Sequence, residues 1–132
     1  HGALLHERRT DPMRRRGQWI ALADISPRLR ETVLALEDHR FERHHGVDWL
    51  ALAAAARDTL RGRARGASTI TMQVAAQLDP DLRASSRRSW RQKWRQIRAA
   101  RELDAAWSKT QILETYLNLA SYRGELQGID SA

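Results

Sequence analysis

The chain has 132 residues, of which 42% are apolar and 30% charged, so it can form one compact domain but not two. Its 23 lysines and arginines exceed its 16 aspartates and glutamates, and the formal net charge of +7 indicates an anionic partner such as nucleic acid, an acidic membrane surface or a phosphorylated small molecule. The absence of cysteine excludes disulfides and thiolate metal sites, and no apolar run approaches the roughly 18 residues of a membrane span.

The first 25 residues are predicted to form an N-terminal leader with a short β-hairpin. Residues 3–6 and 19–23 read as short alternating stretches, and a turn-like segment at 10–12 lies between them. Such short alternation is a weak signal for a strand pair. The domain core is expected to run from residue 26 to residue 132.

The first helix is predicted to begin at Ser26-Pro27, because serine is a typical N-cap and proline is favoured at the first helical position. Leu29, Val33 and Leu36 then recur at the spacing of one helical face. Glu37 follows at the C-terminal end of this helix, where we expect it to lie next to the buried face.

Two further helices are predicted in the middle of the chain. Asp48 is expected to cap a helix over residues 49–60, which a basic, glycine-containing loop at 61–66 follows. A third helix is expected from about Ser68 to Leu78, where Asp79-Pro80 ends it.

The segment from 83 to 101 holds eight basic residues and no acid, and apolar residues recur through it at steps of three and four. This pattern predicts an amphipathic helix with a cationic back. Its tryptophans are most simply core residues, although between arginines they could also stack on bases. Ser108 and Gln111 then form an S-x-x-Q capping box that is predicted to open a last helix over residues 112–118. The chain is therefore expected to be mainly α.

Residues 37–41 read E-D-H-R-F, with the adjacent acids Glu37 and Asp38 at the end of an apolar run. They are either the charged end of a helix or a carboxylate directed at a substrate. His39, His44 and His45 raise a metal interpretation, but their spacing matches no H-E-x-x-H site. No Walker loop, dinucleotide fingerprint or G-x-S-x-G elbow is present.

Four motifs occur in order along the chain. They read E-D-x-x-F-x-x-H-x-G-x-D over 37–48, G-A-S-T-I-T-x-Q over 66–73, S-K-x-x-I-L-E-x-Y-L-N over 108–118, and Y-x-G-x-x-x-G-I-x-x-A over 122–132. Together they resemble the peptidoglycan glycosyltransferase domain (family 51) of class A penicillin-binding proteins. The resemblance implies a lysozyme-like, mainly α fold.

The resemblance also implies an activity: polymerisation of lipid II into β-1,4 glycan strands with inversion, from a growing chain on undecaprenyl pyrophosphate. Glu37 would be the general base, which such a reaction needs near its nucleophile. The implied setting is the periplasmic face of the bacterial inner membrane, with moenomycin-type inhibitors as further ligands and no nucleic acid. No cofactor is expected, and a divalent cation such as Mg²⁺ or Mn²⁺ is left open, with no metal ligand assigned.

The motifs assign two further sets of residues. The expected substrate-binding residues are Asp38, Phe41, His44, Ser68, Thr69, Gln73, Lys93, Arg95 and Gln96. The expected structural residues are Gly46, Gly66, Lys109, Glu114, Asn118, Gly124 and Gly128. Among these, Asp38 is expected to orient its neighbours, and Glu114 to tie helices together.

Some positions depart from the family pattern. Gln96 stands where most members carry a glutamate, and Ala54 and Ala76 stand where relatives usually carry a basic residue. Arg57, with Arg83 or Arg87, is a candidate substitute for the missing charges, and Arg123 replaces the usual Phe before Gly124.

Two alternatives stay open. The departures favour a silent domain that binds lipid II or the cell-wall machinery, and the helix of tryptophans and arginines favours a nucleic-acid binder. No S-x-x-K occurs, so no transpeptidase domain is expected, and we expect a core truncated at its C-terminus with its membrane anchor absent.

Overall fold

In the computed structural model the described residues are 15–16, 19–63, 66–83, 90–122 and 126–127. The main helices are α1 (Pro27–Glu37), α2 (Trp49–Leu60), α3 (Ile70–Leu78), α5 (Trp90–Ala106) and α6 (Lys109–Leu119). Shorter helices are η1 (Leu22–Asp24), η2 (Phe41–Arg43) and α4 (Pro80–Arg83). The mainly α prediction is therefore confirmed.

Three two-residue strands form one small sheet: β1 (Arg15–Arg16), β2 (Ser121–Tyr122) and β3 (Leu126–Gln127). Their order is β1-β3-β2, with β1 parallel and β2 antiparallel to β3. The sheet therefore joins the two ends of the described chain, and none of its strands lies within 19–23.

The caps read from the sequence are confirmed at the start of α2 and of α6. The Asp48 side chain accepts from the Ala51 N–H at the start of α2, and Ser108 and Gln111 form the predicted capping box of α6. Helix α3 begins two residues later than expected, at Ile70, because Thr69 is its N-cap and accepts from the Met72 N–H. Ser26 occupies the N-cap position of α1 without a side-chain cap, and Pro27 begins the helix.

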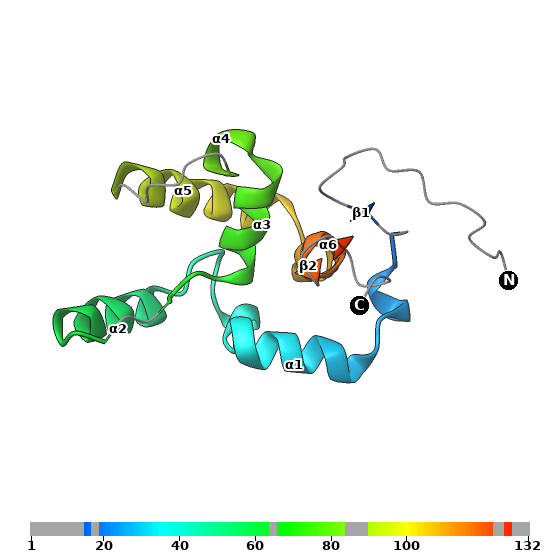
Figure 1. The fold of residues 1–132 in the computed structure, drawn as a ribbon, viewed down its shortest axis with the longest axis horizontal. Helices are drawn as coiled ribbons and strands as arrows, with labels where there is room; N and C mark the ends of the chain where they lie inside the picture. Colours follow the sequence, from blue (N-terminus) through cyan, green and yellow to red (C-terminus); the bar gives the residue numbers. More distant parts are fainter. Residues whose placement is uncertain (1–14, 17–18, 64–65, 84–89, 123–125, 128–132) are drawn as a thin grey trace, which may run out of the picture.

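Helix α3 is the centre of the fold (Figure 1). Its Ile70 and Val74 belong to one buried cluster, which includes Phe41 and residues of α6. Its Met72 and Ala75 belong to a second cluster with α5. Because both sides of α3 are covered, its side chains are held by packing, which suits a helix that presents a site.

The expected strand over 19–23 is wrong. Leu22 begins the 3-10 helix η1, and the segment before it is held by α6. Asn118 accepts from the Ile20 N–H and donates to the Ile20 carbonyl oxygen, both at 2.9 Å. These side-chain bonds take the place of a strand partner. The other expected strand, over 3–6, lies outside the described residues.

Two expectations about apolar faces are also wrong. Leu36 is 79% exposed and α1 has no fully buried residue, so Glu37 does not end a deeply buried face. Trp90 and Trp94 of α5 are 84% and 61% exposed rather than core, whereas Ile97 and Ala100 further along the helix are buried. Helical spacing identified the face correctly, but the first half of that face is uncovered.

Gly46 shows why a glycine is needed where the first motif meets α5. Its φ is +80°, a region that favours glycine. A Cβ built there would lie 2.5 Å from the Ala100 carbonyl oxygen. The backbone of the first motif therefore approaches α5 more closely than any other residue would allow.

Candidate active site

Helix α1 ends at the two adjacent acids, and they face different surroundings. Asp38 is 6% exposed and His44 7%, and His44 Nε2 lies 2.9 Å from each oxygen of the Asp38 carboxylate. The Ile70 N–H, at the start of α3, donates to Asp38 Oδ2 at 3.0 Å. Asp38 thus joins the end of α1, the loop after it and α3, which is the orienting role the sequence suggested.

Glu37 has an exposed side chain, which reaches α3 at one point. Gln73 Nε2 donates to Glu37 Oε2 at 3.1 Å. The two side chains lie in a groove of about 400 Å³. The groove is lined by Val33, Leu36, Glu37, Gln73, Gln77, Tyr116 and Ala120. The first and second motifs, about 30 residues apart, therefore meet at this carboxylate.

The buried Thr69 fixes α3 against the first motif. Its hydroxyl donates to the Gly46 carbonyl oxygen at 2.6 Å and accepts from the Met72 N–H at 3.1 Å. The Ile70 N–H donates to Asp38 and the Met72 N–H donates to Thr69, so neither N–H group is available to a phosphate. The hydrogen bonds to Asp38 and Gly46 fix the N-terminus of α3 to other parts of the protein.

A second polar cluster lies at the other side of the α3 N-terminus. Lys93 Nζ of α5 donates to Ser68 Oγ at 3.2 Å and lies 3.5 Å from Gln96 Oε1. Gln96 Nε2 in turn donates to the Met72 carbonyl oxygen at 3.2 Å. Ser68, Lys93 and Gln96 are therefore brought together as expected, and the Gln96 amide crosslinks α5 to α3.

This cluster lies on a groove of about 590 Å³ between α2 and α5, which Figure 1 shows diverging from the centre of the molecule. Ser68 and Lys93 contribute polar groups to its lining. The aromatic and larger apolar lining residues are Trp49, Leu52, Trp90, Trp94 and Ile97. The groove thus offers a cation beside an extended apolar surface.

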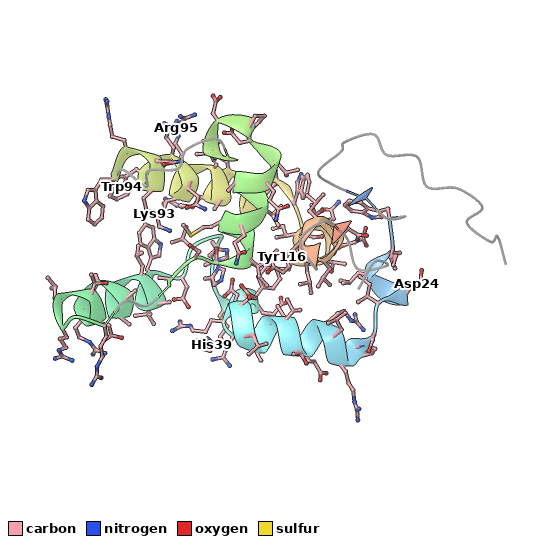
Figure 2. All side chains as sticks on the ribbon, viewed as in Figure 1. Asp24, His39, Lys93, Trp94, Arg95 and Tyr116 are labelled. Carbon is pink, nitrogen blue, oxygen red and sulfur yellow. The ribbon has the colours of Figure 1, made fainter. Side chains whose placement is uncertain are left out.

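Arg95 does not join Lys93. Figure 2 shows Lys93 pointing from α5 toward α2, and Arg95 leaving the opposite side of the helix. Its Nη2 lies 3.7 Å from Asp81 Oδ2 of α4. Residues two positions apart on a helix are about 200° apart around its axis, so Lys93 and Arg95 leave α5 on opposite sides. The structure therefore does not bring Arg95 to the side of α5 that carries Lys93.

Three other expected substrate contacts are buried side chains. Phe41 is 1% exposed and packs in the core cluster of α3 and α6, while His44 and Thr69 are engaged within the protein. All three side chains are therefore buried and in contact with other parts of the protein. Among the histidines, His44 binds Asp38 and His45 Nδ1 lies 3.6 Å from Asp104 Oδ2. Within the part of the chain that the structure describes, no three His, Cys, Asp or Glu residues group as metal ligands do.

Lys109 links the fourth motif to the first. Its Nζ donates to the His44 carbonyl oxygen at 2.7 Å and to Asp104 Oδ1 at 2.6 Å, and it lies 4.7 Å from the centre of the Phe41 ring. Asp104 was missed in the sequence, because a lone acid on a helix carries no signal of the lysine that it will meet. Its buried carboxylate neutralises Lys109.

Glu114 ties α6 to Trp19 and to Leu22, the first residue of the 3-10 helix η1. Its carboxylate accepts from the Leu22 N–H and from the Trp19 indole N–H, each at 2.8 Å. The Leu22 bond, followed by the Trp19 bond, lowers the pKa of Glu114, against a smaller opposing effect of burial. With Asn118, Glu114 therefore explains why segment 19–22 adopts its observed path.

The remaining expected positions divide into three groups. Gly66 lines the groove between α2 and α5, but nothing near it requires a glycine. Ala54 and Ala76 are half-buried, and Arg57 lies 3.4 Å from its neighbour Asp58. Gly124, Gly128, Arg87 and Arg123 lie outside the described residues, as does the side chain of Arg83.

The arrangement defines a class of site: an exposed carboxylate on one groove, and a cation beside a separate apolar groove between α2 and α5. A family model described as "Transglycosylase" matches residues 1–132. The chain belongs to this transglycosylase family. The family is consistent with the lysozyme-like, mainly helical fold that the motifs implied.

Curated relatives carry the name "Biosynthetic peptidoglycan transglycosylase". The protein from Rhodospirillum centenum is 42% identical over 116 residues, which cover 87% of this chain and 48% of the relative. Those from Agrobacterium fabrum and Pasteurella multocida are 39% and 38% identical over 116 residues, covering 87% of this chain and 50% and 46% of theirs. The chain spans about half the length of the curated relatives that it matches.

Proposed function

We propose that this chain is the catalytic core of a peptidoglycan glycosyltransferase that polymerises lipid II into β-1,4 glycan strands with inversion. The observation that carries the proposal is a pair of grooves beside α3: Glu37 lies in one with Gln73 of α3, and Lys93 lies in the other with Ser68, two residues before α3 begins. A donor with a charged diphosphate and a long apolar tail matches the second groove in both respects. The name of the curated relatives, "Biosynthetic peptidoglycan transglycosylase", supports the same substrate class.

In the proposed reaction, the 4-hydroxyl oxygen of the acceptor sugar attacks C1 of the donor sugar from the face opposite the leaving group. The O–C1 bond forms while the bond from C1 to the diphosphate oxygen breaks, which inverts the configuration. Glu37 accepts the hydroxyl proton, and the polyprenyl diphosphate departs with the electron pair. Lys93, with Ser68 beside it, stabilises the negative charge that develops on the diphosphate.

The groove between α2 and α5 supports a membrane setting for this reaction. Trp49, Leu50 and Leu60 of α2 and Trp90 and Trp94 of α5 are exposed apolar side chains. None of the helices in the described ranges is long and apolar enough to cross a membrane. We place the domain at the periplasmic face of the bacterial inner membrane, with tryptophans and arginines at the lipid surface.

Within the family, the chain resembles the penicillin-binding protein 1C type. The resemblance rests on Met72 and Gln96, which stand where most members carry glutamine and glutamate. The Gln96 amide donates to the Met72 carbonyl oxygen, a backbone atom that any residue at position 72 would supply. This bond requires a donor at position 96, which a glutamate in its ionised form lacks.

A second candidate function is a silent domain of the same fold that binds lipid II without turning it over. It is favoured by Gln96, which cannot ionise, and by the neutral Ala54 and Ala76.

The test is glycan synthesis from labelled lipid II by the full-length protein, resolved on a gel, together with binding of moenomycin. Polymer formation supports the enzyme. Moenomycin binding without any polymer supports the silent domain and contradicts the enzyme.

A further inference from the structure

We infer that Gln73 is a positioning residue for the Glu37 carboxylate. The inference rests on the proposed function, in which Glu37 is the general base, and it departs from the expectation that Gln73 binds substrate. Its basis is the hydrogen bond of 3.1 Å from Gln73 Nε2 to Glu37 Oε2. No described residue donates to the other oxygen, Oε1, so one oxygen is held and one is left for the acceptor hydroxyl.

Helix α3 holds the two adjacent acids with residues one turn apart. The Ile70 N–H holds Asp38 at 3.0 Å, and the Gln73 side chain, three residues later, holds Glu37. The side chain of Glu37 and the side chain of the residue after it are therefore both hydrogen-bonded to α3. The orientation of the carboxylate follows the helix rather than the loop after α1.

The position of α3 is itself fixed. The Gln73 N–H donates to the Thr69 carbonyl oxygen at 3.1 Å, and the Thr69 hydroxyl donates to the Gly46 carbonyl oxygen at 2.6 Å. Gly46 in turn lies against the backbone of α5, where a Cβ would clash with Ala100. A rigid chain of contacts therefore leads from α5 through α3 to the Gln73 amide.

The chemical need for such a contact follows from the exposure of Glu37. A glutamate at a helix end has three rotatable side-chain torsions, and an exposed one populates several rotamers. General-base catalysis requires the carboxylate within hydrogen-bond reach of the proton it accepts. A neutral amide can hold the carboxylate without competing for the proton, because the amide nitrogen is a donor only.

The kinetic test separates this role from direct substrate binding. In the full-length protein, Gln73→Met keeps the length of the side chain and removes the donor, and Gln73→Asn keeps the donor but shortens its reach. Positioning predicts that both variants lower kcat about ten- to a hundredfold, with KM within about twofold. In the Glu37→Gln background, Gln73→Met should cause no further loss of kcat. A raised KM at unchanged kcat, or an additive loss, overturns the inference.

A matched control and an independent readout complete the experiment. Gln111→Met removes an amide that caps α6, and it should leave kcat unchanged. The side-chain amide resonance of Gln73 should move as Glu37 titrates in the wild type and stay fixed with pH in Glu37→Gln. An unmoved resonance in the wild type overturns the contact itself. A wild type that makes no polymer overturns the proposed function, and the positioning role with it.

Discussion

The Asp38 carboxylate accepts a hydrogen bond from the Ile70 N–H at 3.0 Å, which joins the end of α1 to the first turn of α3. The same carboxylate binds His44, so three segments meet at one buried acid. The neighbouring Glu37 is exposed and lies on a groove. One acid of the pair is therefore structural, and the other is presented to solvent.

Asp38→Asn is expected to destabilise the protein by about 1–3 kcal/mol, because it removes the negative charge and puts an N–H₂ donor in place of one of the two acceptor oxygens that lie 2.9 Å from His44 Nε2. Turnover should fall as well, since α3 loses its link to the end of α1. Denaturant unfolding and turnover measure the two effects. Asp24→Asn, an exposed acid of η1, is the control (Figure 2). Equal stability of Asp38→Asn and wild type would contradict the assigned role.

Gly46→Ala is expected to destabilise more than Gly62→Ala. Both glycines have positive φ, +80° and +75°, so each substitution carries a backbone cost of roughly 1–2 kcal/mol. Only at Gly46 does the added Cβ meet another backbone, at 2.5 Å from the Ala100 oxygen, whereas nothing lies within 4 Å of it at Gly62. Thermal or chemical unfolding of the two variants gives the comparison. Equal losses would show that the close approach to α5 has no energetic consequence.

The contribution of Glu114 to the free energy of unfolding should depend on pH. Its pKa is lowered in the folded protein by the bonds from Leu22 and Trp19, so its stabilisation is fully present above the ordinary value of 4.5. The stabilisation is lost as pH falls from there through the lowered folded pKa. The free energy of unfolding of wild type should therefore decline more steeply with acid than that of Glu114→Gln. Parallel curves for the two proteins between pH 5 and 3 would refute the assignment.

The double variant Trp90→Ala/Trp94→Ala is expected to bind anionic lipid vesicles at least about tenfold more weakly than wild type, because each large exposed side chain loses its burial in the lipid interface. Leu78→Ala, an exposed apolar residue at the end of α3, should bind as wild type does. Vesicle cosedimentation measures both. Unaltered binding of the double variant would remove this face as the membrane contact.

Local signals in the sequence predicted the helices well. The caps at Asp48 and Ser108 depend on residues three apart, and both are confirmed. The path of residues 19–22 could not be predicted in this way, because it is set by Glu114 and Asn118, more than 90 residues further along the chain. A short apolar stretch looks the same whether a strand or a distant side chain satisfies its backbone.

The candidate site was partly predictable for a similar reason. Ser68, Lys93 and Gln96 were all expected at the substrate site, and the structure brings them together where the segment before α3 meets α5. The sequence did not show that Arg95 leaves α5 on the side opposite to Lys93 and pairs with Asp81, nor that Trp94 is exposed. Periodicity defines a helical face, but only the packed structure shows what covers that face. The domain boundary at residue 26 stays a prediction.

The most direct test of Glu37 as general base is lipid II polymerisation by the full-length protein and its Glu37→Gln variant, with Glu31→Gln, an exposed acid of α1, as the matched control. The account predicts that kcat falls at least about a hundredfold in Glu37→Gln, the usual contribution of a positioned base, while lipid II still binds and Glu31→Gln keeps wild-type turnover. Polymer synthesis by Glu37→Gln at the wild-type rate would contradict the account.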